Sequence, residues 1–368
     1  MKQSELFEFA CQCLLPDKNT GQKKGIEEKF ISGEVDLNRF VFLCSNHLVL
    51  PAIYLRLKDA GLIELFPNEY VDHLKEIYET NKKRNRDILL QIDEISSRLK
   101  KENIEPLYLK GTANLMDNLY SDLGVRMIGD IDFLVQEKDY LKTVDLILDL
   151  GYENQHKMYE DAKSFKHYPR LFRKDVPADI EIHRVPVNIQ YSKQFHTDLL
   201  FQHKKAIKNR SNCFVSSDEH KLIHTFIHSQ LSNKGHKRIT LELRDLYDAQ
   251  LLLKRVDVNS VLPQVEEKIK ARDFFEYVNY LFNPEQISLS DKLPNNFAVR
   301  HQWFLNHSRW HRTYLNILNF YELIIIRYLW RIIRAPFQKS SMRYLYVRLK
   351  DPKWYKMHFK GVRDSFRR

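Results

Sequence analysis

The sequence predicts an α+β fold, in which a small mixed β-sheet is flanked by helical regions before and after it in the chain. Apolar residues recur at helical spacing in residues 1–95 and again in 191–295. Between these regions, residues 96–190 contain short apolar runs that are separated by turns. The last region, 296–368, carries basic and aromatic residues at helical spacing. The 368-residue chain is 43% hydrophobic and 29% charged, which is the composition of a globular protein.

Residues 1–95 are expected to form a helical cap that packs on the sheet region. Apolar side chains between Phe40 and Leu57 follow the three-four spacing of amphipathic helices, and a long helix is expected from about Asn68 to Lys100. Residues 1–15 are also amphipathic, but they lack the basic start and continuous apolar run of a signal peptide, so we expect none. No pattern in this region is typical of a catalytic site.

Residues 96–190 are expected to alternate between strands and helices. Lys110-Gly111 ends the first strand, and Thr112 is expected to cap a helix that continues to Gly124. Another helix is expected over 139–150. This order suits a small mixed sheet with helices on one side. The expected strands are 106–109, 128–135, 168–172 and 178–183.

Beyond Pro186 the chain is expected to be helical again, up to about residue 295. Apolar residues at 222–227 and at 243–251 mark two of these helices. Arg244 and Asp248 are four residues apart on the second one, so a helical ion pair between them is expected.

The cysteines indicate a reducing, cytoplasmic environment. They form no CxxC pair, and none lies near a histidine at the spacing of a zinc site. Free, buried thiols are therefore expected at all four positions, which are Cys11, Cys13, Cys44 and Cys213.

Two aspartates on one predicted strand form the strongest candidate for a metal site. Asp130 and Asp132 are two residues apart, so their side chains point to the same face of the sheet. Two carboxylates this close repel each other unless a cation lies between them. Mg²⁺ prefers such oxygen ligands together with substrate phosphates. Because the pair stands between apolar residues, a solvated loop is a poor interpretation, and we expect a Mg²⁺ (or Mn²⁺) site.

Further residues could complete this site. Glu181, on a later strand, is a third acid. The turn Lys110-Gly111-Thr112 ends a strand and opens a helix, where free backbone N–H groups can bind phosphate. Arg126, four residues before Asp130, can meet a phosphate oxygen, whereas Lys110 and Arg126 could equally form structural ion pairs. His183 shares the face of Glu181 and is either a support for a metal ligand or a buried histidine.

These motifs resemble those of the "uncharacterised nucleotidyltransferase" family, a branch of the DNA polymerase beta-like nucleotidyltransferase superfamily. The resemblance covers roughly residues 85–255. It rests on a strand ending in Leu-Lys-Gly, a helix with Leu-Tyr, an arginine, Asp-x-Asp before apolar residues, an acid-x-His segment and a later His paired with Arg and Asp. In this sequence these are Leu109-Lys110-Gly111, Leu119-Tyr120, Arg126, Asp130-Ile131-Asp132, Glu181-Ile182-His183, and His228 with Arg244 and Asp248.

The resemblance implies a nucleotidyltransferase that works through two metal ions. Asp130 and Asp132 would hold Mg²⁺ ions that bridge the triphosphate of an NTP such as ATP. Glu181, where the superfamily usually has Asp, would complete the second metal site or act as a base toward the acceptor hydroxyl.

The same resemblance assigns phosphate contacts and an acceptor class. Gly111 and Thr112 would cradle the β- and γ-phosphates, and Lys110 and Arg126 would offset charge near the leaving pyrophosphate. The acceptor would be a hydroxyl or a phosphate, and bacterial relatives point to cell-surface polysaccharide synthesis. The alternatives are a non-catalytic or toxin–antitoxin-type binding module with the same fold, and an enzyme that modifies RNA.

The positive charge of the chain is concentrated in its last fifth. Residues 300–368 contain 16 Lys and Arg against 3 Asp and Glu, which gives this region a net charge of +13. Because the whole chain has a net charge of +11, the remaining residues have a net charge of −2. Residues 313–368 mix these cations with aromatic residues. They could therefore lie on an anionic membrane surface or pack on the protein as an ordinary helix. A third alternative, which we favour less, is that they bind RNA. The longest apolar stretch, Tyr314–Ile333, contains Glu322 and two arginines, which argues against a spanning helix. A cytoplasmic protein is expected, and it would be peripheral at the membrane if residues 313–368 lie on an anionic surface.

Overall fold

The computed structural model confirms the α+β prediction and describes residues 1–16, 20–154, 166–283 and 293–322, with single positions beyond them. The chain forms two compact units, Met1–His301 and Gln302–Arg368. Most of residues 313–368 lie outside the described residues, so the membrane and RNA interpretations of that region remain predictions. Within the described residues, no helix is both long enough and apolar enough to cross a membrane.

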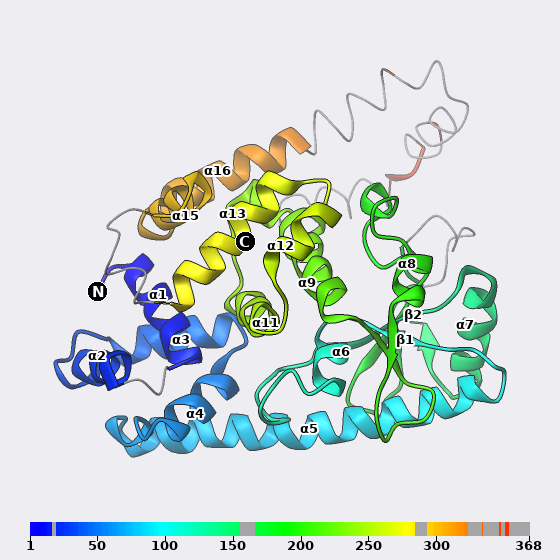
Figure 1. Ribbon diagram of the computed structural model, residues 1–368, viewed down its shortest axis with the longest axis horizontal. Helices are drawn as coiled ribbons and strands as arrows, with labels where there is room; N and C mark the ends of the chain where they lie inside the picture. Colours follow the sequence, from blue (N-terminus) through cyan, green and yellow to red (C-terminus); the bar gives the residue numbers. More distant parts are fainter. Residues whose placement is uncertain are drawn as a thin grey trace. The chain divides into compact units, whose positions relative to one another are not determined.

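The N-terminal part of the first unit is helical, as predicted. Its last helix, α5, has a buried stripe that includes Tyr78, Ile88, Ile92, Ile95 and Leu99. This helix of 33 residues is about 50 Å long, which allows it to pack on α4 at one end and on the sheet at the other (Figure 1). The helices are α1 (Gln3–Leu14), α2 (Thr20–Ile31), α3 (Leu37–Asn46), α4 (Leu50–Asp59) and α5 (Asn68–Lys100).

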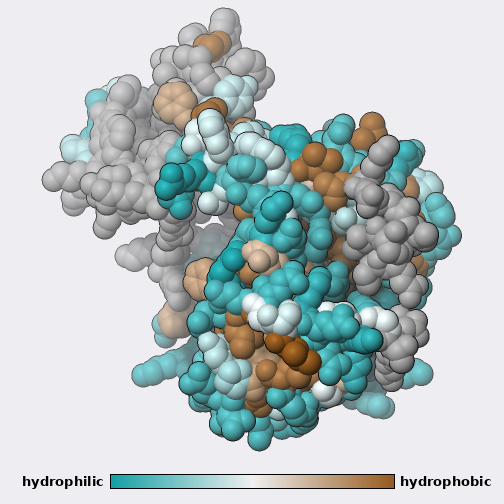
Figure 2. Space-filling view, turned by 90° about the vertical axis from the view of Figure 1, so that its left-hand side faces the viewer, coloured by the Kyte–Doolittle hydropathy of each residue, from teal (hydrophilic) through white to brown (hydrophobic). Residues whose placement is uncertain are grey.

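These helices bury most of their apolar residues against one another. All four cysteines are free and buried, as expected, and burial raises the pKa of Cys11, Cys13 and Cys44. Figure 2 faces the side on which these helices lie and shows a mainly hydrophilic surface with a few hydrophobic groups. The most exposed large apolar side chains of these helices include Ile31 and Phe42.

A seven-stranded mixed sheet follows, in the order β3-β4-β5-β2-β1-β7-β6. β2 and β5 are its central parallel pair, and their register places Asp132 opposite Glu181. Two helices accompany these strands, α6 (Lys110–Met116) and α7 (Tyr140–Asp149). The strands are β1 (Leu107–Tyr108), β2 (Asp130–Leu134), β3 (Glu153–Asn154), β4 (Leu171–Phe172), β5 (Asp179–His183), β6 (Lys204–Ala206) and β7 (Phe214–Ser216).

The two faces of the sheet differ in chemistry because side chains alternate along a strand. On one face, Tyr108 packs against Phe133. The Tyr108 hydroxyl lies 2.7 Å from the hydroxyl of Ser96 on α5. The other face carries Asp130, Asp132 and Glu181. The long helix therefore covers the apolar face and leaves the acids on the opposite one.

Two sequence predictions in this part are wrong. Residues 204–216 were expected to be helical, but they contribute β6 and β7, and β7 pairs in parallel with β1. The helix after β1 begins at Lys110 and ends at Met116, so Thr112 is not its cap. Instead, the Thr112 hydroxyl donates to the backbone carbonyl of Asp130 at 3.2 Å and ties the helix to β2.

The remaining helices of the first unit lie beside the sheet or between it and the N-terminal helices (Figure 1). Ser217 caps α9 by accepting from the backbone N–H of His220. α9 continues as a π-helical turn, Ile227–Ser232, and packs on both α11 and α6. These helices are α8 (Thr197–Gln202), α9 (Asp218–Phe226), α10 (Gly235–Arg238), α11 (Leu243–Leu253), α12 (Val258–Val261) and α13 (Lys268–Phe282).

The second unit is described only in part. α15 (Asn296–Asn306) crosses the boundary between the units, and α16 (Ser308–Phe320) lies in the second one. Aromatic side chains stack along these helices, for example Trp303 on His307 at a centroid distance of 4.5 Å. The division of the chain into four regions at 95, 190 and 295 remains a prediction.

Candidate active site

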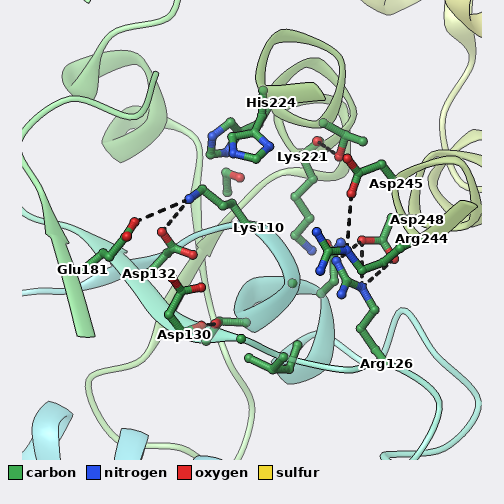
Figure 3. Close-up of a pocket in the computed structure, with 18 of the residues that line it drawn as sticks. Lys110, Arg126, Asp130, Asp132, Glu181, Lys221, His224, Arg244, Asp245 and Asp248 are labelled. Carbon is green, nitrogen blue, oxygen red and sulfur yellow. Dashed lines mark hydrogen bonds and ion pairs between the residues drawn. The ribbon is translucent and has the colours of Figure 1, made fainter. Parts of the chain in front are cut away.

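A cavity of about 330 Å³ lies between the acidic face of the sheet and the helices α9 and α11 (Figure 3). One side consists of Asp130, Asp132 and Glu181, which we call the acid wall. The opposite side, which we call the ion-pair wall, consists of Arg126, Lys221, Arg244, Asp245 and Asp248. The turn Lys110-Gly111-Thr112 also lines the cavity.

The acid wall follows directly from strand geometry. Asp130 and Asp132 share one face of β2, while Ile131 between them is fully buried on the other face. The parallel register with β5 then places Glu181 beside Asp132. Glu181, which is distant in sequence, therefore meets the pair Asp130 and Asp132 at one edge of the cavity.

Lys110 supplies a cation to this wall. Its ammonium lies 2.6 Å from Asp132 Oδ1 and 3.9 Å from Glu181 Oε2. The backbone of Lys110 has a φ of +53°, a left-handed conformation that costs a non-glycine residue on the order of 1 kcal/mol. Such strain at the first residue of α6 coincides with a lysine whose side chain reaches into the acid wall.

Two histidines stand next to the acids. His183 is fully buried, and its Nε2 lies 2.8 Å from Asp132 Oδ1 and 3.6 Å from Glu181 Oε2. His167 Nε2 lies 3.8 Å from Glu181 Oε2. His183 thus contacts two of the three acids directly, whichever of its two predicted roles it has.

Arg170, just before β4, bridges the acid wall from the solvent side. One guanidinium nitrogen, Nη2, donates to Asp130 Oδ2 at 2.7 Å and to Glu181 Oε1 at 3.1 Å. Arg170 falls within the expected strand 168–172 but was not predicted as a site residue. Alternation could have found it, because Leu171 pairs with Ile180, so Arg170 belongs to the face of Glu181.

The acids have different pKa values because their surroundings differ. Burial opposes the charge of Asp132, but Lys110 and His183 outweigh it and hold its pKa well below the ordinary value. Burial also opposes the charge of Glu181, yet its contact with His183 and nearby cations lower its pKa to about 2. The pKa of Asp130 is raised instead, by burial and by repulsion from the two other acids. Negative charge is thus crowded at Asp130.

The donor set fits a divalent metal ion. Asp132, Glu181 and His183 each offer a ligand atom, and these atoms all lie within 4.8 Å of one another. Asp130 adds carboxylate oxygens at the mouth of the same wall. Carboxylates suit Mg²⁺ and Mn²⁺, and imidazole suits several transition metals. The crowding of charge at Asp130 is the condition that a bound cation would relieve.

Two buried charges of the ion-pair wall, Arg126 and Asp248, pair with each other. Arg126 is buried and donates through Nε and Nη2 to Asp248, at 3.0 to 3.2 Å, and through Nη1 to the carbonyl of Met127. The Tyr120 hydroxyl donates to the same carboxylate at 2.8 Å. The expected Arg244–Asp248 ion pair is therefore wrong, because Asp248 is taken by Arg126. Arg244 instead has its Nε 3.6 Å from Asp245 Oδ1.

The same wall continues onto α9. The buried ammonium of Lys221 donates to Asp218 Oδ1 at 3.0 Å and also to Asp117. His224 is buried above Lys110, and burial followed by the charge of Lys110 lowers its pKa to about 3 (Figure 3). Lys221 and His224 line the cavity, and their place there depends on how α9 packs, which residue spacing does not reveal.

The seven residues predicted to form the site all line this one cavity. Arg126, on the ion-pair wall, packs against Gly111 of the turn. An added Cβ at Gly111 would lie 3.0 Å from Ile128 Cδ1 and 3.4 Å from Arg126 Nη2, so a glycine allows this close approach. The predicted residues are Lys110, Gly111, Thr112, Arg126, Asp130, Asp132 and Glu181.

The sheet, the acid wall and the turn Lys110-Gly111-Thr112 are together the features expected of a nucleotidyltransferase. The model of the "uncharacterised nucleotidyltransferase" family matches residues 33–283, and the chain belongs to that family. The match covers the acid wall, the ion-pair wall and the helices that carry them. Among curated proteins, none matches the chain at a significant level.

Proposed function

We propose that this protein transfers a nucleotidyl group from a nucleoside triphosphate such as ATP to a hydroxyl or phosphate acceptor, with Mg²⁺ or Mn²⁺. The observation that carries the proposal is the parallel register of β2 and β5, which brings Glu181 beside Asp132 on the cavity side. This arrangement agrees with a DNA polymerase beta-like nucleotidyltransferase, in which acids on adjacent strands hold the metal.

The acids of this chain would hold the ions. Asp132 and Glu181 offer buried oxygens, and Asp130 offers its carboxylate at the mouth of the wall. When bound, divalent ions would neutralise the charge that develops on the triphosphate. Glu181 either completes a second metal site or acts as the base toward an acceptor hydroxyl. His183 orients Asp132 through its 2.8 Å contact.

The turn and its neighbours bind and orient the phosphates. Gly111 leaves the backbone open to a close approach, and the Thr112 hydroxyl, held by Asp130, fixes the turn beside the acids. The ammonium of Lys110, at 2.6 Å from Asp132, stands where it can offset the charge of the leaving pyrophosphate. Catalysis would then consist of positioning and electrostatics, without a nucleophile on the protein.

For the acceptor, we propose only a chemical class, a hydroxyl or a phosphate on a hydrophilic molecule. Most of the cavity lining beyond the acids is polar, which suits a hydrophilic acceptor. The family resemblance favours an acceptor in cell-surface polysaccharide synthesis, and a membrane-linked acceptor would agree with the basic region 313–368.

The test is to incubate the protein with each α-labelled NTP, Mg²⁺ or Mn²⁺ and a cell extract. Wild type should transfer label, and the double variant Asp130→Ala/Asp132→Ala should not. Glu137→Gln is the matched control, because this exposed carboxylate lies just after β2, pairs with Arg184 and is outside the cavity. If label is transferred by wild type and not by the double variant, the labelled NTP identifies the nucleotide and the labelled product identifies the acceptor. Absence of label with every nucleotide would favour a non-catalytic binding module.

A further inference from the structure

Arg170 differs from Arg126, another arginine that is bound to a carboxylate in the cavity. The Arg170 side chain is 51% exposed, whereas that of Arg126 is 9% exposed. Arg126 uses three nitrogens for hydrogen bonds, whereas Arg170 uses only Nη2. Among the described residues, Nε and Nη1 of Arg170 have no hydrogen-bond partner. Arg170 is thus held by two carboxylates but is free to leave them.

The carboxylates that hold Arg170 belong to the proposed metal ligands. Its contacts reach Asp130 Oδ2 at 2.7 Å and Glu181 Oε1 at 3.1 Å. A guanidinium that bridges these oxygens occupies ligand atoms that a divalent ion would need. A cation and Arg170 therefore compete for the same negative charge.

Resting on the proposed function, we propose that Arg170 is a phosphate-binding residue that exchanges partners during loading. Before loading, it neutralises Asp130 and Glu181. When a divalent ion takes these carboxylates, the guanidinium is released at the mouth of the cavity and binds the triphosphate. A guanidinium suits both partners, because its planar fork matches carboxylate and phosphate alike.

The exchange requires that the released side chain still faces the ligand. Arg170 lines the same cavity as the turn Lys110-Gly111-Thr112. Because the Arg170 side chain is half exposed, its pairs with Asp130 and Glu181 cost less to break than the buried pair of Arg126 with Asp248. Arg170 thereby couples the binding of metal and of triphosphate: each ligand makes room for the other.

The variant Arg170→Gln tests the exchange through binding rather than activity. We would titrate Mn²⁺ by electron paramagnetic resonance and then inorganic tripolyphosphate by calorimetry at saturating Mn²⁺. Without its competitor, the acid wall should bind Mn²⁺ about fivefold more tightly, the effect of one partly exposed ion pair. The same variant should bind tripolyphosphate about tenfold more weakly, because a charge-assisted hydrogen bond is lost.

Two matched variants separate pairing from simple charge removal. Lys166→Gln removes another cation that lines the same cavity. Among the described residues, no carboxylate lies within 4.0 Å of the Lys166 ammonium, so this variant removes charge without breaking an ion pair. Arg173→Gln removes an arginine of the same segment that pairs with Glu94, outside the cavity. Opposite changes in the two affinities, for Arg170→Gln alone, support the exchange. Equal effects in Lys166→Gln, or a change in only one of the two affinities, overturn it.

The outcome also separates this proposal from the proposed function. If wild type binds Mn²⁺ no better than Asp132→Asn, the acids hold no metal and the proposed function fails. If wild type binds Mn²⁺ through the acids but Arg170→Gln behaves like wild type, only the exchange fails. Arg170→Lys, which keeps the charge but not the fork, serves as a second variant should Arg170→Gln not fold.

Discussion

The two walls of the cavity contain the same kinds of charged groups but arrange them differently. On the ion-pair wall, Arg126 and Asp248 are both buried and satisfy each other with three contacts of 3.0 to 3.2 Å. On the acid wall, three carboxylates share Lys110 and the half-exposed Arg170. The Arg126–Asp248 pair is therefore complete without a ligand, whereas the acid wall carries an excess of negative charge at Asp130.

The difference separates structural from functional charge. A buried pair whose donors are all engaged fixes the position of α11 against the loop before β2, and breaking it leaves an unpaired buried charge. A bound cation would stabilise the crowded carboxylates of the acid wall. We therefore expect the reaction to take place at this wall. Removing one charged group at a time tests this division.

The largest effect is expected on the acid wall, in activity rather than in stability. Asp130→Asn should lower nucleotidyl transfer by about 10³-fold, the size seen when an electrostatic group is removed from a transition state. The unfolding free energy should change by less than about 1 kcal/mol, since Asp130 is held by one partly exposed ion pair. Rates with labelled NTP and urea unfolding measure the two effects.

Metal-dependent stabilisation provides an independent readout for the same variant. Mn²⁺ should raise the Tm of wild type, because a ligand that binds only the folded state stabilises it. The rise should shrink in Asp130→Asn and persist in Glu137→Gln. Equal stabilisation of all three proteins would place the Mn²⁺ site elsewhere.

A smaller effect, in stability, is expected on the ion-pair wall. Arg126→Met should lower the unfolding free energy by about 3 kcal/mol, because Asp248 is left charged and buried. Replacing both partners by Arg126→Met/Asp248→Leu should cost less than this single change. Chemical unfolding of the three proteins checks the prediction, and a single variant as stable as wild type would show that Arg126 is free for another role.

The smallest effect concerns pH and His224, between the two walls. Its folded pKa of about 3 lies below the ordinary 6.5, because the imidazole is buried near Lys110. A lowered histidine pKa favours the neutral folded form, so its contribution is complete above pH 6.5 and is lost as the pH falls toward 3. At pH 5 the loss should reach about 2 kcal/mol. His224→Gln should remove this part of the acid destabilisation in Tm measured from pH 7 to pH 5.

Much of the fold could be predicted because periodic patterns dominate it. The helix from Asn68 to Lys100 was predicted at its observed bounds, since its apolar stripe is long. β6 was missed because Lys204–Ala206 has neither alternation nor branched residues, and it forms only by pairing with β7. Local sequence carries no sign of such a pairing.

The acid wall could be predicted, and the ion-pair wall could not, for a related reason. Asp130 and Asp132 lie on one strand, so their shared face follows from alternation. Arg126 and Asp248 are 122 residues apart, and the helical spacing of Asp248 pointed to Arg244 instead. Contacts across a fold depend on how helices pack, which residue spacing does not reveal.

The central claim is that the acid wall holds divalent ions. Its most direct test is anomalous diffraction from crystals of the wild type grown with Mn²⁺ and inorganic tripolyphosphate. We expect an anomalous peak bounded by the carboxylates of Asp130, Asp132 and Glu181, with tripolyphosphate beside the turn at Gly111. Clear density for the three side chains without a Mn²⁺ peak among them would contradict the claim.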